Sequence, residues 1–216
     1  MKPILSEQER QRLDKRVAEV EARTGTQIVL AFVSRSDVYA ELPWKAFALG
    51  AGLAGLATTL LDLLRPAWSS SHTILLTTTA ILASGAACSL LCTTVPGFAR
   101  IFLDGFRAET EVRQYAESLF LSRQVFATEQ RRGVLLLVSL FEHKAVLLPD
   151  SGLKERLSPD AQKNVLARLT ARIADGNIAA ALEQGLIGLE EVMGAGPAGA
   201  AGKNELPDSV VEEEGV

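Results

Sequence analysis

Two apolar stretches decide the fold of this chain: KAFALGAGLAGLATTLLDLL at residues 45–64 and TILLTTTAILASGAACSLLCTTV at residues 73–95. The second stretch holds no charged residue, and the first holds only Lys45 at its start and Asp62 near its end. A helix that crosses a bilayer needs about 20 apolar residues, and both stretches reach that length. Because a chain of 216 residues has little else with which to bury two such helices, we expect a transmembrane helical hairpin over residues 43–98.

Basic residues are unevenly placed around this hairpin. Arg35 precedes it, Lys45 stands at its start, and three arginines follow it within residues 100–113. The only basic residue in the loop between the two stretches, apart from His72, is Arg65. Lys and Arg concentrate on the cytoplasmic side of membrane proteins. The pattern therefore predicts a two-pass protein with its N-terminus and both soluble segments in the cytoplasm. Since both segments lie on the same side, they can build one domain together.

The first soluble segment, residues 1–42, is typical of a helix followed by a buried strand. Ser6 and Glu9 have the spacing of a capping box, which opens a helix, and Gly25 ends it. Residues 27–33 (QIVLAFV) then form a continuous apolar run. A strand that is apolar on both faces indicates the middle of a sheet covered by helices.

The second soluble segment, residues 99–194, supplies the rest of the domain. Apolar residues at helical spacing predict a helix from Ala108 to Leu119, and two more helices follow Ser158 and Asn177. Between them, residues 134–140 and 145–148 predict two antiparallel strands joined by a turn. The order helix, strand, hairpin, helix, two strands, two helices predicts a small mixed-sheet α/β/α sandwich interrupted by the transmembrane hairpin.

The end of the chain and the charge balance exclude several classes. Residues 195–216 are rich in Gly, Ala, Pro and acidic residues, which predicts a disordered acidic tail. That tail accounts for the net charge of −4, so no folded part is basic enough to indicate nucleic acid as a partner. Both cysteines, Cys88 and Cys92, lie in the second apolar stretch, so the soluble part has no disulfide framework and no thiolate metal cluster.

Carboxylates are the only candidate metal ligands in the soluble part. Phosphate-binding loops, dinucleotide fingerprints, HExxH and GxSxG are all absent from the sequence. Asp37 follows the first predicted strand, Asp150 follows the third, and Asp160 starts a helix. Oxygen ligands gathered at strand ends would suit Mg²⁺ or Ca²⁺. Each of the three also fits an ordinary position as a turn former or helix cap, and both interpretations stay open here.

Several segments resemble the TPM domain family, whose members include photosystem repair and receptor-modulating proteins. They are residues 21–29 (EARTGTQIV), 115–120 (YAESLF), 132–138 (RGVLLLV) and 150–153 (DSGL), and the resemblance covers about residues 5–41 and 105–193. Ser36-Asp37-Val38-Tyr39 with a two-helix insertion is similar to a bacterial membrane-bound branch of the family. The resemblance implies an α/β/α sandwich, a bacterial inner membrane location, and the lipid bilayer and another membrane protein as partners.

Some members of the family are metal-dependent acid phosphatases, and here the sequence departs from them. Glu129-Gln130-Arg131-Arg132 stands where the family carries an Asp-Asn-Gly pattern. Two arginines repel a divalent cation, although they attract a phosphate or an acidic partner. We therefore expect a non-catalytic factor that assembles or maintains another membrane protein. The alternative is a phosphatase that holds Mg²⁺ or Ca²⁺ on Asp37, Asp150 and Asp160.

Overall fold

A computed structural model describes residues 5–64, 71–174, 177–194, 206, 210–213 and 215. The helices are α1 Glu7–Thr24, α2 Glu41–Leu64, α3 Ser71–Thr94, α4 Pro96–Ala99, α5 Gly105–Ser122, α6 Pro159–Ala174 and α7 Ile178–Met193. Three short 3₁₀ helices are η1 Arg100–Phe102, η2 Val125–Ala127 and η3 Ser151–Leu153. The strands are β1 Gln27–Val33, β2 Gly133–Ser139, β3 Lys144–Pro149 and β4 Val211–Glu213.

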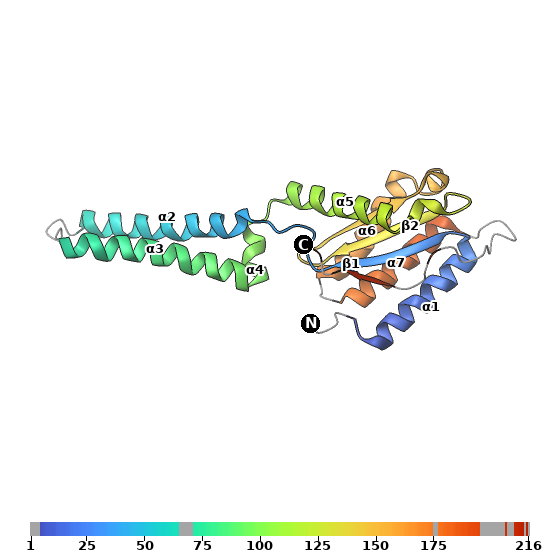
Figure 1. Ribbon diagram of the computed structural model, residues 1–216, viewed down its shortest axis with the longest axis horizontal. Helices are drawn as coiled ribbons and strands as arrows, with labels where there is room; N and C mark the ends of the chain where they lie inside the picture. Colours follow the sequence, from blue (N-terminus) through green and yellow to red (C-terminus); the bar gives the residue numbers. More distant parts are fainter. Residues whose placement is uncertain are drawn as a thin grey trace. The chain divides into compact units, whose positions relative to one another are not determined.

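These elements divide into two compact units (Figure 1). One is an α/β unit of Met1–Asp37 and Phe106–Val216, and the other is a hairpin unit of Val38–Gly105. The hairpin unit is wider than the predicted range of 43–98, because α2 begins at Glu41 and α4 and η1 follow α3. The chain thus leaves the α/β unit after β1 and returns to it at α5.

The sheet of the α/β unit is mixed and has the order β3-β2-β1-β4. β1 and β2 are parallel, with Gln27 opposite Gly133, and β2 and β3 are antiparallel, with Val134 opposite Pro149. The antiparallel pairing of β2 and β3 was predicted from the short turn between them. β1 and β2 occupy the centre, as expected for strands that are apolar on both faces.

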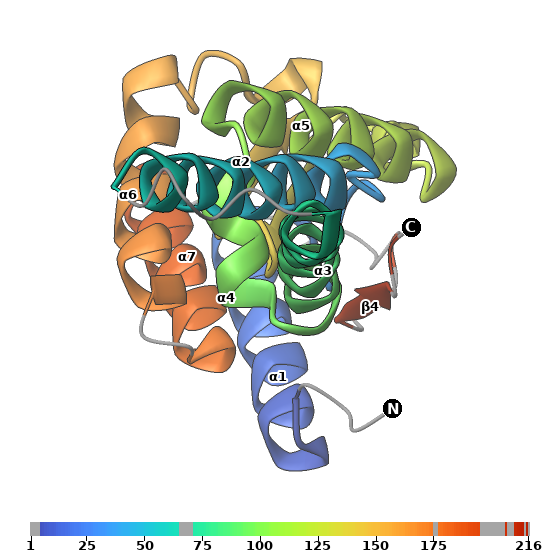
Figure 2. The ribbon, with the colours of Figure 1, turned by 90° about the vertical axis from the view of Figure 1, so that its left-hand side faces the viewer.

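Alternate residues of the central strands enter two separate cores. In β1, Ile28, Leu30 and Phe32 pack in the core that also contains the apolar stripes of α1, α6 and α7. Val29, Ala31 and Val33 pack in the core formed with α5. In Figure 2, α6, α7 and α1 follow one another around one side of the unit, and α5 lies on the other. The predicted α/β/α sandwich is confirmed.

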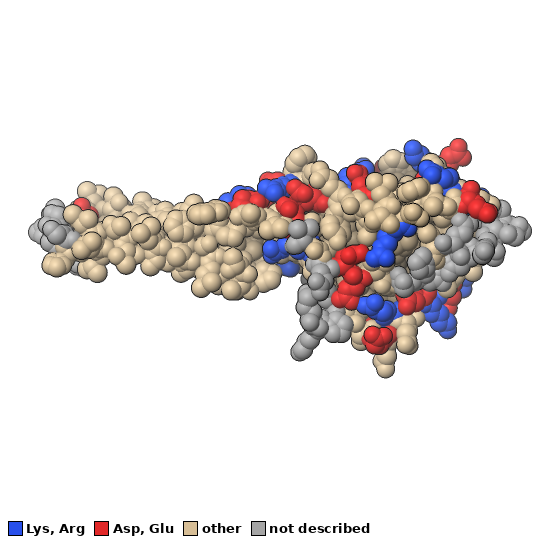
Figure 3. All heavy atoms as spheres, in the orientation of Figure 1, with Lys and Arg blue, Asp and Glu red and all other residues tan. Residues whose placement is uncertain are grey.

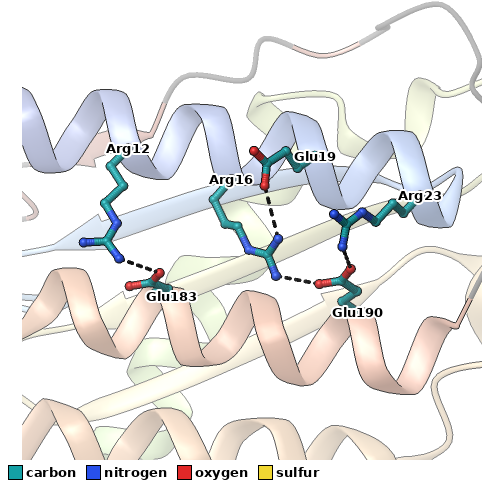
Figure 4. A network of polar contacts seen from close by, with 6 residues as sticks. All are labelled: Arg12, Arg16, Glu19, Arg23, Glu183 and Glu190. Carbon is teal, nitrogen blue, oxygen red and sulfur yellow. Dashed lines mark hydrogen bonds and ion pairs between the residues drawn. The ribbon is translucent and has the colours of Figure 1, made fainter.

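Ion pairs join α1 to α7 along their exposed sides (Figure 4). Arg12 pairs with Glu183 at 3.0 Å, and Arg16 and Arg23 reach the two carboxylate oxygens of Glu190 at 2.6 and 2.7 Å. Hydrogen bonding from Arg23 is the largest cause that lowers the pKa of Glu190. Burial opposes it, and the charges of Arg16 and Arg23 lower the pKa further. The network aligns two helices that cover the same face of the sheet.

The stability of the α/β unit should therefore fall in acid partly through Glu190. Because its folded pKa lies below the ordinary 4.5, its contribution is present above that pH and is lost as the pH falls through the folded pKa. The partly exposed pair contributes at most about 1 kcal/mol. The free energy of unfolding in urea, measured from pH 3 to pH 7, should change less with pH in Glu190→Gln than in the wild type. If the unfolding free energies of the two proteins changed equally with pH, Glu190 would contribute nothing to the acid sensitivity.

The predicted disorder of residues 195–216 is wrong for one short segment. Val211–Glu213 form β4, which pairs parallel with β1 at the edge of the sheet, with Ala31 opposite Val211. Leu206 and Val210 are buried beside it. The composition of this segment does not predict a strand, because two valines followed by acidic residues form one only by pairing with the open edge of β1. The rest of the predicted tail lies outside the described residues.

The hairpin unit pairs α2 and α3 through small residues. A side chain on Gly50 would place its Cβ 2.7 Å from Cys88 Sγ and Ser84 O, and Ser84 Oγ donates to Gly50 O at 3.0 Å. Close backbone approach of this kind is typical of helices that pack in lipid. Glu41–Leu64 and His72–Thr94 are both long and apolar enough to cross a membrane, and only 6% of each apolar window is buried. Figure 3 shows almost no charged side chain along them.

Candidate functional site

The three aspartates proposed as metal ligands lie in different places. Asp37 follows the carboxyl end of β1, where Arg107 Nη2 donates to its Oδ2 at 3.0 Å. Asp150 follows β3, and its N–H donates to Gly133 O at 2.8 Å, beside the first residue of β2. Asp160 is exposed in the first turn of α6.

Sheet topology separates the first two of these carboxylates. β2 runs parallel to β1 and β3 runs back, so the end of β3 lies beside the beginning of β1 and β2. A strand of seven residues spans about 20 Å. Asp37 and Asp150 are thus at opposite ends of the sheet, too far apart to bind one ion. The predicted cluster of Asp37, Asp150 and Asp160 is not formed, and the described part of the chain holds no group of three or more His, Cys, Asp or Glu placed to bind a metal.

Asp150 faces an arginine at its end of the sheet. Its carboxylate is 6% exposed, Oδ1 accepts from Ser151 N at 2.6 Å, and Oδ2 lies 3.2 Å from Arg131 Nε. This contact is an ion pair rather than a hydrogen bond, because the Nε–H is directed to Ser151 Oγ at 3.4 Å. A guanidinium therefore neutralises the most buried of the three aspartates.

Backbone contacts hold Arg131 against this carboxylate. Arg131 has a φ of 54°, and its Nη1 donates to Phe126 O at 3.1 Å. Gly152 N donates to Arg131 O at 3.0 Å, and a Cβ on Gly152 would lie 2.5 Å from Gln130 O. Only glycine fits at that distance, which explains the Asp-Ser-Gly sequence after β3. The sequence indicated that Arg131 and Arg132 stand in place of a cation site, and the structure shows that Arg131 itself supplies the positive charge.

A second buried carboxylate, Glu142, lies at the opposite end of the sheet. It accepts hydrogen bonds from Ser36 N at 2.9 Å, from Ser36 Oγ at 2.5 Å and from Ser139 Oγ. These contacts tie the loop after β1 to the turn after β2, and they position Asp37. The sequence does not reveal this role of Glu142, because a glutamate in a tight turn is ordinarily solvated and its partner Ser36 is 106 residues away.

The two ends of the sheet thus share a chemical character. Each holds a buried carboxylate that is already bound by donors of the same unit, Ser36 and Ser139 at one end and Ser151 with Arg131 at the other. Such groups stabilise loops and orient neighbouring backbone. A divalent cation at Asp150 would have to displace a positively charged guanidinium.

Comparisons with known proteins agree with this fold. The model of the TPM domain matches residues 94–192. The NMR structure of the BA42 protein from the psychrophilic bacterium Bizionia argentinensis is similar with a TM-score of 0.53 at 12% identity, over 98% of this chain and 97% of that one. At this identity the likeness concerns the fold alone. No curated protein matches the chain.

The matched residues leave out the first part of the resemblance found in the sequence. Residues 5–41 lie outside the range of 94–192, separated from it by the hairpin. In the structure, α1 and β1 nevertheless belong to the same compact unit as α5, β2, β3, α6 and α7. The match to the TPM domain at residues 94–192 thus falls within a compact unit that α1 and β1 complete.

Proposed function

We propose that this protein is anchored in a bacterial inner membrane by α2 and α3 and acts there as a non-catalytic factor that assembles or maintains another membrane protein. The observation that carries the proposal is the apolar surface of the hairpin. Leu53 is 59% exposed, Leu63 and Leu76 are 77% and 71% exposed, and further leucines on both helices are exposed as well. Each helix has 24 residues and spans about 36 Å, which exceeds a hydrocarbon core of about 30 Å.

Placement of the TPM domain in the cytoplasm is supported by the charges at the ends of the hairpin. Lys45 lies in the first turns of α2, where its Nζ donates to Phe102 O at 3.2 Å, and Arg100 follows α4. Trp44 is 73% exposed beside them, as is common for indoles in the headgroup layer. Basic residues together with an exposed indole favour the cytoplasmic interface for this end of the hairpin.

Cysteine labelling tests the orientation. In a chain with Cys88→Ala and Cys92→Ala, a His72→Cys substitution should react with a membrane-impermeant maleimide in intact cells. A Lys154→Cys substitution in the same background should react only after the membrane is permeabilised. The reverse pattern would place the α/β unit on the outer side of the membrane. Recovery of the labelled chain in the soluble fraction would show that it is not anchored in the membrane.

The ion pair between Asp150 and Arg131 favours a binding role over phosphate ester hydrolysis. The phosphatase alternative needs this carboxylate as a metal ligand, yet Arg131 lies against it and Asp37 is at the other end of the sheet. A cation beside the Arg131 guanidinium would be repelled by a full like charge at short range. Binding another protein requires no such ion.

Co-purification and a turnover assay distinguish the two roles. The tagged full-length chain, cross-linked in membranes and purified in mild detergent, should capture at least one membrane protein reproducibly, whereas an untagged chain should not. The same preparation should show neither saturable Mg²⁺ or Ca²⁺ binding by calorimetry nor hydrolysis of an aryl phosphate. Metal-dependent turnover that Asp150→Asn abolishes, without any captured protein, would establish the phosphatase instead.

A further inference from the structure

Strand β4 covers the outer edge of β1 with residues from the end of the chain. Val211, Glu212 and Glu213 lie opposite Ala31, Phe32 and Val33, and Ser34 N donates to Glu213 O at 3.3 Å. Just before β4, Val210 N donates to Asp14 Oδ1 at 2.9 Å. The pairing is only three residues long, although β1 has seven.

Side chains of this segment alternate between the two faces of the sheet. Val210 is 3% exposed in the core under α1, and Val211 packs against the core under α5. Glu212 then pairs with Arg10 of α1 at 2.6 Å, and Glu213 pairs with Arg123, directly after α5, at 2.9 Å. Because successive strand residues point to opposite faces, one arginine on each face contacts one of two consecutive acids.

Glu213 also lies close to a tyrosine on α5. Burial raises the pKa of Tyr115, and the negative charge of Glu213 raises it further. Both ion pairs of β4 are partly exposed, with side-chain exposures between 28% and 46%. Pairs of this kind add little affinity but select the charge pattern of the segment that binds.

The chain beyond β4 approaches the end of β1 closely. Gly215 has a φ of 81°, and a Cβ there would lie 1.9 Å from Arg35 O and 2.9 Å from Val33 Cγ2. Any larger residue would separate the tail from the end of β1. The edge therefore accepts an apolar pair and an acidic pair, and two positions after the acidic pair a residue without a side chain.

We propose that the outer edge of β1 is a peptide-binding site for an extended segment of a partner protein in which two apolar residues precede two acidic residues. Residues 210–213 occupy it in cis until such a segment replaces them by strand addition. A tethered tail acts at an effective concentration of about millimolar, so only a partner held at the same surface competes with it. The inference names the chemistry of the partner and rests on the proposed binding role.

The probe for this site is a fluorescent peptide of residues 206–216, LPDSVVEEEGV, added to the full-length chain in detergent. A chain with Glu212→Lys and Glu213→Lys should bind it at least tenfold more tightly than the wild type, because Arg10 and Arg123 repel the altered tail. Gly215→Val should increase binding in the same direction without any change of charge. If a chain with Glu212→Lys, Glu213→Lys and Gly215→Val binds the probe no more tightly than the wild type does, the proposal is wrong.

Charge reversal separates recognition from misfolding. Adding Arg10→Glu and Arg123→Glu to the lysine-tail chain restores attraction for its own tail, so the acidic probe should lose its binding. Gly215→Val releases a wild-type tail. In that chain, the same two arginine changes should favour a probe that carries lysine in place of Glu212 and Glu213. Arg113→Glu, at an α5 arginine paired with Glu117 at 3.1 Å, should change neither result. Equal binding of both probes by the reversed chain would refute the assigned arginines.

Two further outcomes identify other occupants. If the wild-type chain is a dimer that the lysine tail dissociates without any gain in probe affinity, the tail is exchanged between two copies and the proposal fails. Probe binding by a chain that captures no membrane protein would remove the accessory role while leaving the β1 edge a peptide-binding site. The peptide and co-purification experiments can therefore fail separately.

Discussion

Replacement of Gly133 by valine is expected to lower the free energy of unfolding of the α/β unit by about 3 kcal/mol or more. Gly133 is the first residue of β2, and a Cβ there would lie 2.0 Å from Val125 O and 2.8 Å from Val125 Cγ1. A backbone oxygen cannot rotate away as a side chain can. The substitution must therefore move either η2 or the start of β2, where Gly133 O also accepts from Asp150 N.

Amide hydrogen exchange of β2 peptides in the full-length chain measures this loss, because the amides of central strands exchange only when the unit unfolds globally. Gly188→Ala is the matched control. Its added Cβ would lie 3.4 Å from Val165 Cγ2, and alanine favours a helix over glycine by about 1 kcal/mol, so α7 should keep its stability. Unchanged protection of β2 in Gly133→Val would show that η2 is not where the structure places it.

Truncation of Leu136 to alanine should cost about 3 kcal/mol of unfolding free energy. Leu136 is fully buried at the middle of β2, in the core that α7 covers. Gly185 of α7 is close to it, since a Cβ on Gly185 would lie 2.8 Å from both Leu136 Cδ2 and Leu169 Cδ1. The truncation leaves a cavity beside Gly185, where α7 packs against β2.

The pair Leu136→Ala and Gly185→Ala should not be additive. Gly185→Ala alone overpacks the core, but it enters the space left by the truncated leucine, so the double variant should be less destabilised than the sum by about 1 kcal/mol or more. Leu137→Ala provides the control, because Leu137 is equally buried but faces the α5 core. Its effect should add to that of Gly185→Ala. Additivity in both pairs would contradict the packing of α7 on β2.

Local patterns in the sequence were sufficient to predict most elements of the α/β unit. The capping box of Ser6 and Glu9 forms within four residues, with Ser6 N donating to Glu9 Oε2 at 2.8 Å. The run from Gln27 to Val33 is apolar on both faces and became a central strand with those bounds. Two long apolar stretches predicted α2 and α3, because a helix satisfies its own backbone hydrogen bonds whatever surrounds it.

The partners of the charged residues were decided only by the tertiary structure. Nothing local indicates that Arg131 faces Asp150, that Glu142 binds Ser36, or that two glutamates near the end of the chain meet arginines on both faces of the sheet. The reversal of β3 placed Asp37 and Asp150 at opposite ends of the sheet, which no count of acidic residues reveals. Helices and continuous apolar strands can be recognised from residues a few positions apart. A short edge strand such as β4, or a charged site, depends on which distant segments meet, and that is a property of the assembled sheet.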